Sequence, residues 1–247
     1  MGNLISVPDG GYSFLKGVFP YSQGVVAARG FTIERLRFAR PVPVSEGFRR
    51  IAAHLKSLGR PKTAFCACEL RSPRPFSFSG FGEFNQGYVA VLKDWGLFRN
   101  GLNAVARSNV APELDPPAEP GFHAFGYTVP APGAAPGYVV AGSGEWPEGG
   151  RFPEDIVARG DVSAGGLRTK AEWVIAMMRA RLAGLGARAE DATITQVYTV
   201  HGIHALLPEI AALTPQASVT WHYCRPPIEG LDYEMDLRAV SCERVLA

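Results

Sequence analysis

The pattern of hydrophobic and polar positions switches between helical and strand periods in a regular order along the second half of the chain. Apolar residues at helical spacing predict a long helix over 166–185, which ends where Gly184 and Gly186 interrupt the pattern. Runs rich in β-branched and aromatic residues predict strands on both sides of it. The predicted order is a strand at 137–145, the helix at 166–185, a strand at 192–200, a short helix at 204–213, and strands at 219–224 and 233–240.

The first half shows the same order of elements. One apolar face predicts a helix over 45–58, with Ser45 as the expected N-cap and Gly59 as the residue that closes it. The elements that follow are a strand at 62–70, a helix at 85–97, and strands at 104–111 and 122–129.

Local similarities between the halves indicate an internal repeat. The segment ending at Gly59 resembles the one ending at Gly186, and a Pro-Pro pair separates the last two strands of each half. A Pro-rich segment at 129–136 is typical of a stiff linker. We therefore predict two copies of one unit of about 120 residues, at 1–130 and 137–247. Because strict βαβ alternation is absent, we expect an α+β fold in which two helices pack on a mixed or antiparallel sheet in each unit.

Composition and charge narrow the classes of protein. The 247 residues carry 25 Lys and Arg against 23 Asp and Glu, and this net charge of +2 disfavours a general nucleic-acid binder. No apolar run approaches the roughly 20 residues that cross a bilayer, so no membrane span is expected. The four cysteines form neither a CxxC pair nor a dense disulfide framework, and the N-terminus lacks a secretion pattern. A cytoplasmic location is therefore expected.

Several short motifs resemble the RidA/YjgF family of small imine and enamine deaminases. In the first half they are Phe19-Pro-Tyr-Ser-Gln-Gly24 and Ala106-Arg-Ser-Asn-Val110, and in the second half they are Ala141-Gly-Ser-Gly-Glu145 and Tyr233-Glu-Met-Asp236. The resemblance implies a chorismate-mutase-like fold for each unit. It also implies a homotrimeric ring with ligand sites in the clefts between neighbouring domains.

The resemblance assigns roles to individual residues. Arg107 corresponds to the family's carboxylate-binding arginine, and a planar guanidinium suits this task because it pairs with both carboxylate oxygens. Glu234 corresponds to the late-strand glutamate, which positions water and shuttles a proton. Tyr21 donates to, or stacks against, a planar conjugated substrate. The other predicted substrate-binding residues are Ser143, Gly144 and Glu145.

The two halves have kept different parts of this site. Counting back from the Pro-Pro pairs places Ala217 opposite Arg107. The stretch that begins at Phe31 has no counterpart of Ser143-Gly144, and the counterpart of Glu234 is close to His123. Complementary loss of this kind predicts one composite cleft that joins the two halves.

Within the family, a doubled chain fits the 2-aminomuconate deaminase group best. The predicted reaction is hydrolysis of an enamine or imine carboxylate with release of ammonia, and it needs no metal, organic cofactor or covalent nucleophile. A dicarboxylate substrate calls for a second cation, for which Arg71, Arg225 and Arg238 are candidates. The alternatives are a member that binds a small carboxylate without turning it over, and a chorismate-hydrolysing relative.

Two other enzyme classes have weaker support. His201, His204, His222 and Cys224 supply donor atoms for a metal, but the HxxH pair lacks the HExxH context of a zinc hydrolase. The stretch around Ser143 has neither the GxSxG spacing of a nucleophile elbow nor the GxGxxG of a dinucleotide site.

Overall fold

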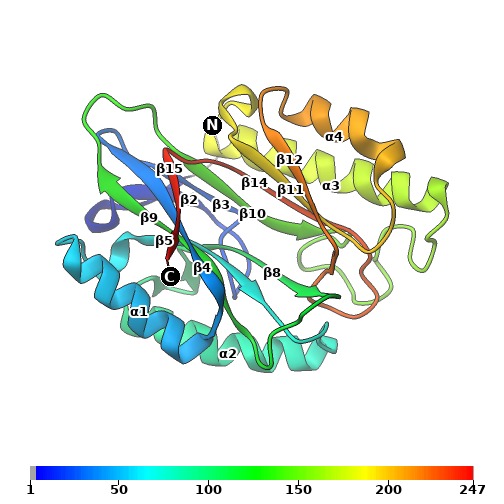
Figure 1. The fold of residues 1–247 in the computed structure, drawn as a ribbon, viewed down its shortest axis with the longest axis horizontal. Coiled ribbons are helices and arrows are strands. Elements are labelled where there is room, and N and C mark those ends of the chain that lie inside the picture. Colours follow the sequence, from blue (N-terminus) through cyan, green and yellow to red (C-terminus); the bar gives the residue numbers. More distant parts are fainter. Residues whose placement is uncertain (1–3, 247) are drawn as a thin grey trace.

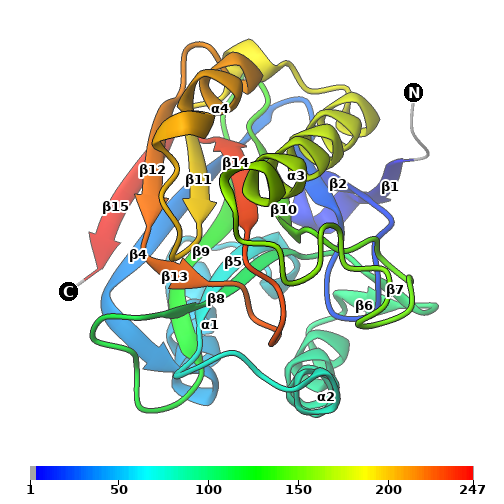
Figure 2. The same ribbon diagram turned by 90° about the vertical axis from the view of Figure 1, so that its right-hand side faces the viewer.

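The computed structural model describes residues 4–246 and consists of two β-sheets with helices on their outer sides. In Figures 1 and 2 the helices α1 (Val44–Ser57) and α2 (Phe78–Asp94) lie on one side of the molecule, and α3 (Ala164–Leu185) and α4 (Leu207–Leu213) lie on the opposite side. One large apolar cluster forms between α1, α2 and the first sheet, and a second forms between α3, α4 and the second sheet. No helix in residues 4–246 is both long and apolar enough to cross a membrane.

The first sheet has six strands. Their order across the sheet is β13 (Cys224–Arg225), β8 (Ala106–Pro112), β5 (Phe65–Arg71), β9 (Gly121–Pro130), β4 (Phe31–Pro43) and β15 (Cys242–Leu246).

The second sheet has seven strands. Their order is β1 (Leu4–Val7), β2 (Tyr12–Leu15), β3 (Gly24–Ala27), β10 (Tyr138–Gly144), β14 (Glu234–Ala239), β11 (Ile194–Tyr198) and β12 (Ser218–His222). Two short strands, β6 (Phe98–Arg99) and β7 (Leu102–Asn103), form a separate hairpin.

Both sheets contain the same four-stranded core. The order β4-β9-β5-β8 in the first sheet matches β10-β14-β11-β12 in the second. In each core the third and fourth strands are parallel and the other neighbours are antiparallel. This topology confirms the predicted α+β fold built from a repeated unit.

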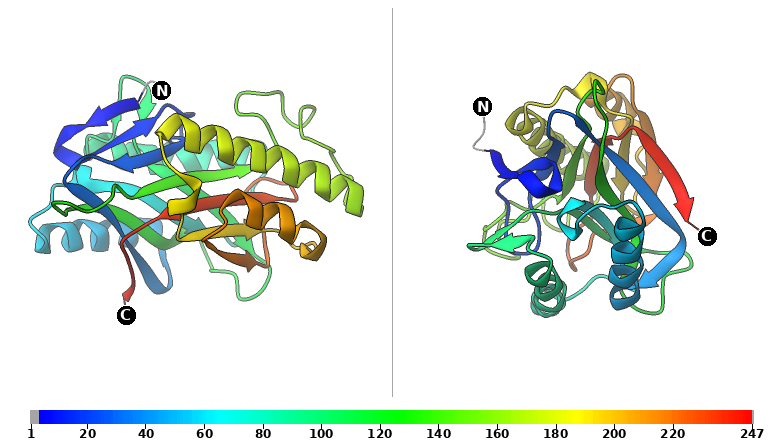
Figure 3. Two further views of the ribbon diagram at one scale, coloured as in Figure 1. Left: turned by 90° about the horizontal axis from the view of Figure 1, so that it is seen from above. Right: turned by 90° about the vertical axis from the view of Figure 1, so that its left-hand side faces the viewer.

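The two ends of the chain cross between the units. The N-terminal strands β1 to β3 join the second sheet through β10, whereas the C-terminal strand β15 joins the first sheet through β4. Figure 3 shows these two ends on opposite sides of the molecule. The division of the chain at 130 and 137 stays a prediction. Each predicted unit also contributes strands to the sheet of the other unit.

Most predicted elements are confirmed within a few residues, and two local predictions are wrong. The helix α1 has Pro43, not Ser45, at its N-cap, without a side-chain cap. The helix α2 begins at Phe78, seven residues before the predicted start at 85, and Ser77 caps it by accepting from the Gly80 N–H. Three glycines in this helix weaken the helical pattern, because glycine is a poor helix former. No strand was predicted at β1 to β4, at β15 or at the short hairpin of β6 and β7.

The strand register corrects the predicted correspondence between the halves. Cys68 and Thr195 are equivalent, since each is the fourth residue after a short 3-10 turn that precedes its strand. Cys68 pairs with Arg107, and Thr195 pairs with Val219. The counterpart of Arg107 is therefore Val219 and not Ala217, because the connection from this strand to the Pro-Pro pair is two residues longer in the first half.

The same register locates the other counterparts. Glu234 corresponds to Gly121, two residues from the predicted His123. Ser143-Gly144 corresponds to Val42-Pro43, which lies at the end of the strand that begins at Phe31. Proline has no backbone N–H, so the first half lacks both the glutamate and one donor of the turn. The observed register therefore supports the complementary loss of site residues in the two halves more strongly than counting from the Pro-Pro pairs did.

Candidate active site

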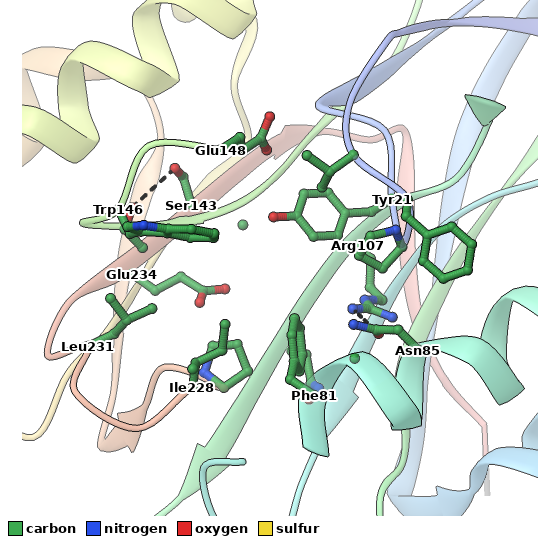
Figure 4. A pocket seen from close by; sticks show the side chains of 18 of the residues that line it. Tyr21, Phe81, Asn85, Arg107, Ser143, Trp146, Glu148, Ile228, Leu231 and Glu234 are labelled. Atoms are coloured by element: carbon green, nitrogen blue, oxygen red, sulfur yellow. Dashed lines mark hydrogen bonds between the residues drawn. The ribbon is translucent and has the colours of Figure 1, made fainter. Parts of the chain in front are cut away.

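A cavity of about 320 Å³ lies where β8 of the first sheet approaches β10 of the second. Both halves contribute to its wall, as the composite-cleft prediction requires, and Figure 4 shows the side chains converging on it. Most of the wall is apolar or aromatic. Its chemically important lining residues are Tyr21, Asn85, Arg107, Ser143, Gly144, Glu148 and Glu234.

Arg107 is a buried cation without a counter-ion. Its side chain is 3% exposed, and its Nη2 donates to Asn85 Oδ1 at 2.8 Å. The guanidinium lies over the rings of Tyr88, Tyr21 and Phe81, with its carbon 4.8, 5.6 and 5.6 Å from their centroids. Its Nη1 has no hydrogen-bond partner, and none of the ion pairs in residues 4–246 includes it. Because a buried charge is normally paired, this arrangement indicates an anion-binding site.

Tyr21 places a hydroxyl at the centre of the cavity. It follows the loop after β2, and its ring packs against the Arg107 guanidinium. In Figure 4 its hydroxyl points into the cavity between Glu148 and Glu234. Burial, and after it the charge of Glu148, raises the pKa of this phenol. The hydroxyl therefore stays protonated and is available as a hydrogen-bond donor.

Glu234 supplies an acid on the side of the cavity opposite Arg107. It is the first residue of β14 and is 4% exposed. Burial, and then the charges of Asp236 and Glu145, raise its pKa well above the usual value of 4.5. Burial therefore favours the protonated form of this carboxyl, which is able to donate a proton.

Gly142 makes room for the Glu234 carboxyl. A Cβ at Gly142 would lie 2.2 Å from Glu234 Oε1, which is far inside van der Waals contact. The register of β10 against β14 also shifts between Val140 and Ser143, and Ser143 and Gly144 then line the cavity. Glycine in this strand therefore serves the close approach of an acid side chain.

Glu145 does not line the cavity, and its predicted role in binding substrate is corrected. Its carboxylate is fully buried and accepts from the backbone N–H groups of Asp232 and Tyr233 at 2.6 and 3.1 Å. Lys170 Nζ lies 3.1 Å from the same carboxylate. Glu145 therefore anchors the segment that leads into Glu234, and both of its oxygens are occupied.

The three candidates for binding a second carboxylate also lie outside the cavity wall. Arg71 lies over the Tyr198 ring at 5.5 Å, Arg225 pairs with Glu113, and Arg238 Nε pairs with Glu243 at 2.7 Å. These three assignments are therefore wrong for the cavity as the structure shows it.

The residues considered as metal ligands are separated in the structure. His201 Nε2 lies 3.3 Å from Asp232 Oδ1, His204 packs against the Trp221 ring, and His222 bonds to Gln196 at 3.1 Å. Within residues 4–246 no group of three or more His, Cys, Asp or Glu side chains is arranged to hold a metal.

Sequence reasoning missed Asn85, Glu148 and the apolar wall. Asn85 orients Arg107 from the middle of α2, where a buried asparagine is unfavourable and is itself a signal of a specific partner. Glu148 lies in the irregular connection between β10 and α3, where no pattern marks it. Trp146, Ile228 and Leu231 come from loops and take part in one small apolar cluster beside the cavity.

Known proteins are similar to this chain in sequence and in fold. The model of the family described as 2-aminomuconate deaminase CnbZ matches residues 4–244. The chain is 46% identical over 252 residues to 2-amino-5-chloromuconate deaminase of Comamonas testosteroni, with 100% of each chain covered. A crystal structure of a chorismatase has a TM-score of 0.52 and 12% identity, over 88% of this chain and 77% of that one. The YjgF gene product of E. coli has a TM-score of 0.30 and 17% identity, over 42% of this chain and 80% of that one.

The chorismatase likeness shows a shared fold, and the family match extends over nearly the whole chain. The identity to the Comamonas protein covers both chains from end to end. The chain therefore belongs to the 2-aminomuconate deaminase CnbZ family.

Proposed function

We propose that this protein hydrolyses the enamine or imine of an aminomuconate-type dicarboxylate, a product of aromatic ring cleavage, and releases ammonia. The observation that carries the proposal is Arg107, which is buried, surrounded by three aromatic rings and free of any carboxylate among the described residues. The relative named as a 2-amino-5-chloromuconate deaminase supports the substrate class.

The proposed chemistry uses groups already present in the cavity. The substrate carboxylate next to the amino group pairs with Arg107, and its planar conjugated chain lies against the aromatic wall, where Tyr21 donates to it. Neutral Glu234 protonates the enamine carbon and leaves an iminium ion. The resulting Glu234 carboxylate then takes a proton from an attacking water.

The tetrahedral intermediate collapses with loss of ammonia. Glu234 returns its proton to the nitrogen, and the C–N bond breaks. The hydroxyl group gives its proton back to Glu234, so the former enamine carbon becomes a ketone and the acid ends neutral. One water is consumed and no redox change occurs. The arginine and the acid act on one substrate from opposite units, so the reaction requires the composite cleft.

Ammonia release from freshly generated enamines tests the proposal. We expect the wild-type protein to release ammonia from 2-aminomuconate faster than the free compound decays, and Arg107→Met to lose this activity. Arg225→Met is the matched control, since Arg225 is exposed and lies outside the cavity wall. Normal turnover by Arg107→Met would refute the site assignment. Binding of the carboxylate without ammonia release would instead identify a non-catalytic binding protein.

Location and assembly belong to the same proposal. A cytoplasmic location agrees with the four free cysteines, Cys66, Cys68, Cys224 and Cys242. We propose an assembly of three chains, and light scattering of the purified protein measures it directly.

A further inference from the structure

The active cavity has a neighbouring cavity, and Glu148 belongs to the wall of both. The second cavity, of about 450 Å³, lies along α3, and Glu148 and Ser143 line both cavities. Arg181 and Gln23 line the second cavity only. Movement of Glu148 would therefore join the two cavities and bring Arg181 to the wall of the active one.

Arg181 and Gln23 form a receptor for a carboxylate. Arg181 is 5% exposed, and its Nη1 donates to the carbonyl oxygens of Ala141 and Gly142 at 2.8 and 3.1 Å, which fixes the guanidinium against β10. Its Nη2 donates to one oxygen of Glu148 at 2.8 Å. Gln23 Nε2 donates to the other oxygen, also at 2.8 Å. Glu148 lies in a loop, whereas Arg181 lies in α3 and Gln23 directly precedes β3.

A dicarboxylate in the active cavity needs such a receptor. Once one carboxylate pairs with Arg107, the described lining residues offer no second cation, and Glu148 faces the cavity as an anion. Two carboxylates placed side by side repel each other. Replacement of Glu148 by the substrate carboxylate removes this repulsion and leaves Arg181 paired, so no buried charge loses its partner.

We propose that Arg181, assisted by Gln23, binds the second carboxylate of the substrate after Glu148 has swung out. Glu148 occupies the receptor in the free protein and is displaced by the ligand. This inference rests on the proposed function, since it concerns the far end of the same substrate.

A matched pair of unreactive ligands tests it. Muconate is a six-carbon diene with a carboxylate at each end, and sorbate has the same chain with a methyl group in place of one carboxylate. Isothermal titration gives both dissociation constants for each variant, and their ratio is the readout. This ratio is insensitive to a general loss of folded protein, which circular dichroism checks separately.

The expected ratios separate the roles of the residues. Arg181→Met should lower the preference for muconate by about tenfold or more, because only muconate loses a charge-assisted bond. Glu148→Gln should raise the preference by about three- to tenfold, since it removes the competing charge without changing the shape of the side chain. Arg225→Met should leave the ratio at the wild-type value.

Two results would overturn the inference. One is an unchanged ratio in Arg181→Met, and the other is a muconate preference that does not rise in Glu148→Gln. The second variant protects the test if loss of Arg181 disturbs β10. Neither result touches the proposed function, which stands or falls on ammonia release and on its dependence on Arg107.

Discussion

Two buried arginines on strands of the first sheet differ in their partners and not in their burial. Arg35 on β4 is 7% exposed, and Arg107 on β8 is 3% exposed. Arg35 donates from Nε and Nη2 to the two oxygens of Glu69 at 2.6 and 2.9 Å, and from Nη1 to Glu243 at 3.3 Å. Arg107 has one amide partner, three aromatic rings and one nitrogen without a hydrogen bond.

The comparison separates an arginine whose partners are all fixed in the protein from one that has room for a further partner. In the Arg35 cluster, burial favours the neutral form of Glu69, but Arg35 and Arg238 override it and hold the pKa of Glu69 well below its usual value. Every charge there has a fixed partner, so the cluster joins the sheets and offers nothing to a ligand. Within residues 4–246 Arg107 has no such charged partner, and a ligand can supply one. The number of charged partners, rather than the degree of burial, distinguishes Arg107 from Arg35.

The largest expected effect is a loss of stability when Arg35 is replaced. Arg35→Met leaves the buried Glu69 with only the more distant Arg238 and Arg71, 3.5 and 3.7 Å away, and we expect the free energy of unfolding to fall by about 3–5 kcal/mol. Urea denaturation followed by circular dichroism measures it. Equal stability of Arg35→Met and wild type would show that the cluster does not hold the sheets together.

Arg107→Met should have the opposite profile. We expect its kcat/KM for an aminomuconate to fall by about 10²–10³-fold, because the carboxylate loses its charged partner and its position. Its free energy of unfolding should stay within about 1 kcal/mol of wild type, since no buried carboxylate is left unpaired. Steady-state ammonia release and urea denaturation on the same samples give both numbers. A large loss of stability would place Arg107 with Arg35 as a structural residue.

Much of the fold could be predicted from sequence because the same order of elements appears in both halves of the chain. The helix that ends at Gly186 and the strands around it carry strong periodic patterns, and the structure has them within two residues of the prediction. The strands β1 to β3 and β15 were missed, because they are short and gain their stability from strands of the other unit. The long strand β4 was also missed. Such pairing is a tertiary effect that a local pattern does not carry.

The candidate site was predictable only where a motif marked it. Arg107, Tyr21, Ser143, Gly144 and Glu234 were predicted from the family resemblance, and the structure brings all five to one cavity. Glu145 belongs to the same motif, but it lies just after the end of β10, and its carboxylate is held by the backbone N–H groups of Asp232 and Tyr233. Glu148 and Asn85 were missed because their roles depend on partners far away in the sequence.

A smaller effect is expected from Gly142→Ala, which acts on the acid opposite Arg107. The added methyl group would lie 2.2 Å from Glu234 Oε1, so the carboxyl must move, and we expect kcat to fall by about tenfold or more. Gly87→Ala in α2 is the matched control, because its added Cβ meets nothing within 4 Å. The control should gain about 0.5–1 kcal/mol of stability from the loss of a helical glycine. Unchanged kcat in Gly142→Ala would mean that the position of Glu234 does not limit the reaction.

The smallest effect concerns pH, and it tests the acid on the side of the cavity opposite Arg107. The pKa of Glu234 in the folded protein is well above the usual value of 4.5. At a pH between the usual pKa and the folded-state pKa, the folded state therefore binds one more proton than the unfolded state. The free energy of unfolding should therefore fall as pH rises through this window, by up to about 1.4 kcal/mol per pH unit, and kcat should fall with it as the acid ionises. Glu234→Gln stays neutral at every pH, so it should lose most activity at all pH values and remove this part of the pH dependence of stability. If urea denaturation gave wild type and Glu234→Gln the same slope against pH, Glu234 would be ionised in the folded protein and would act as a base from the start.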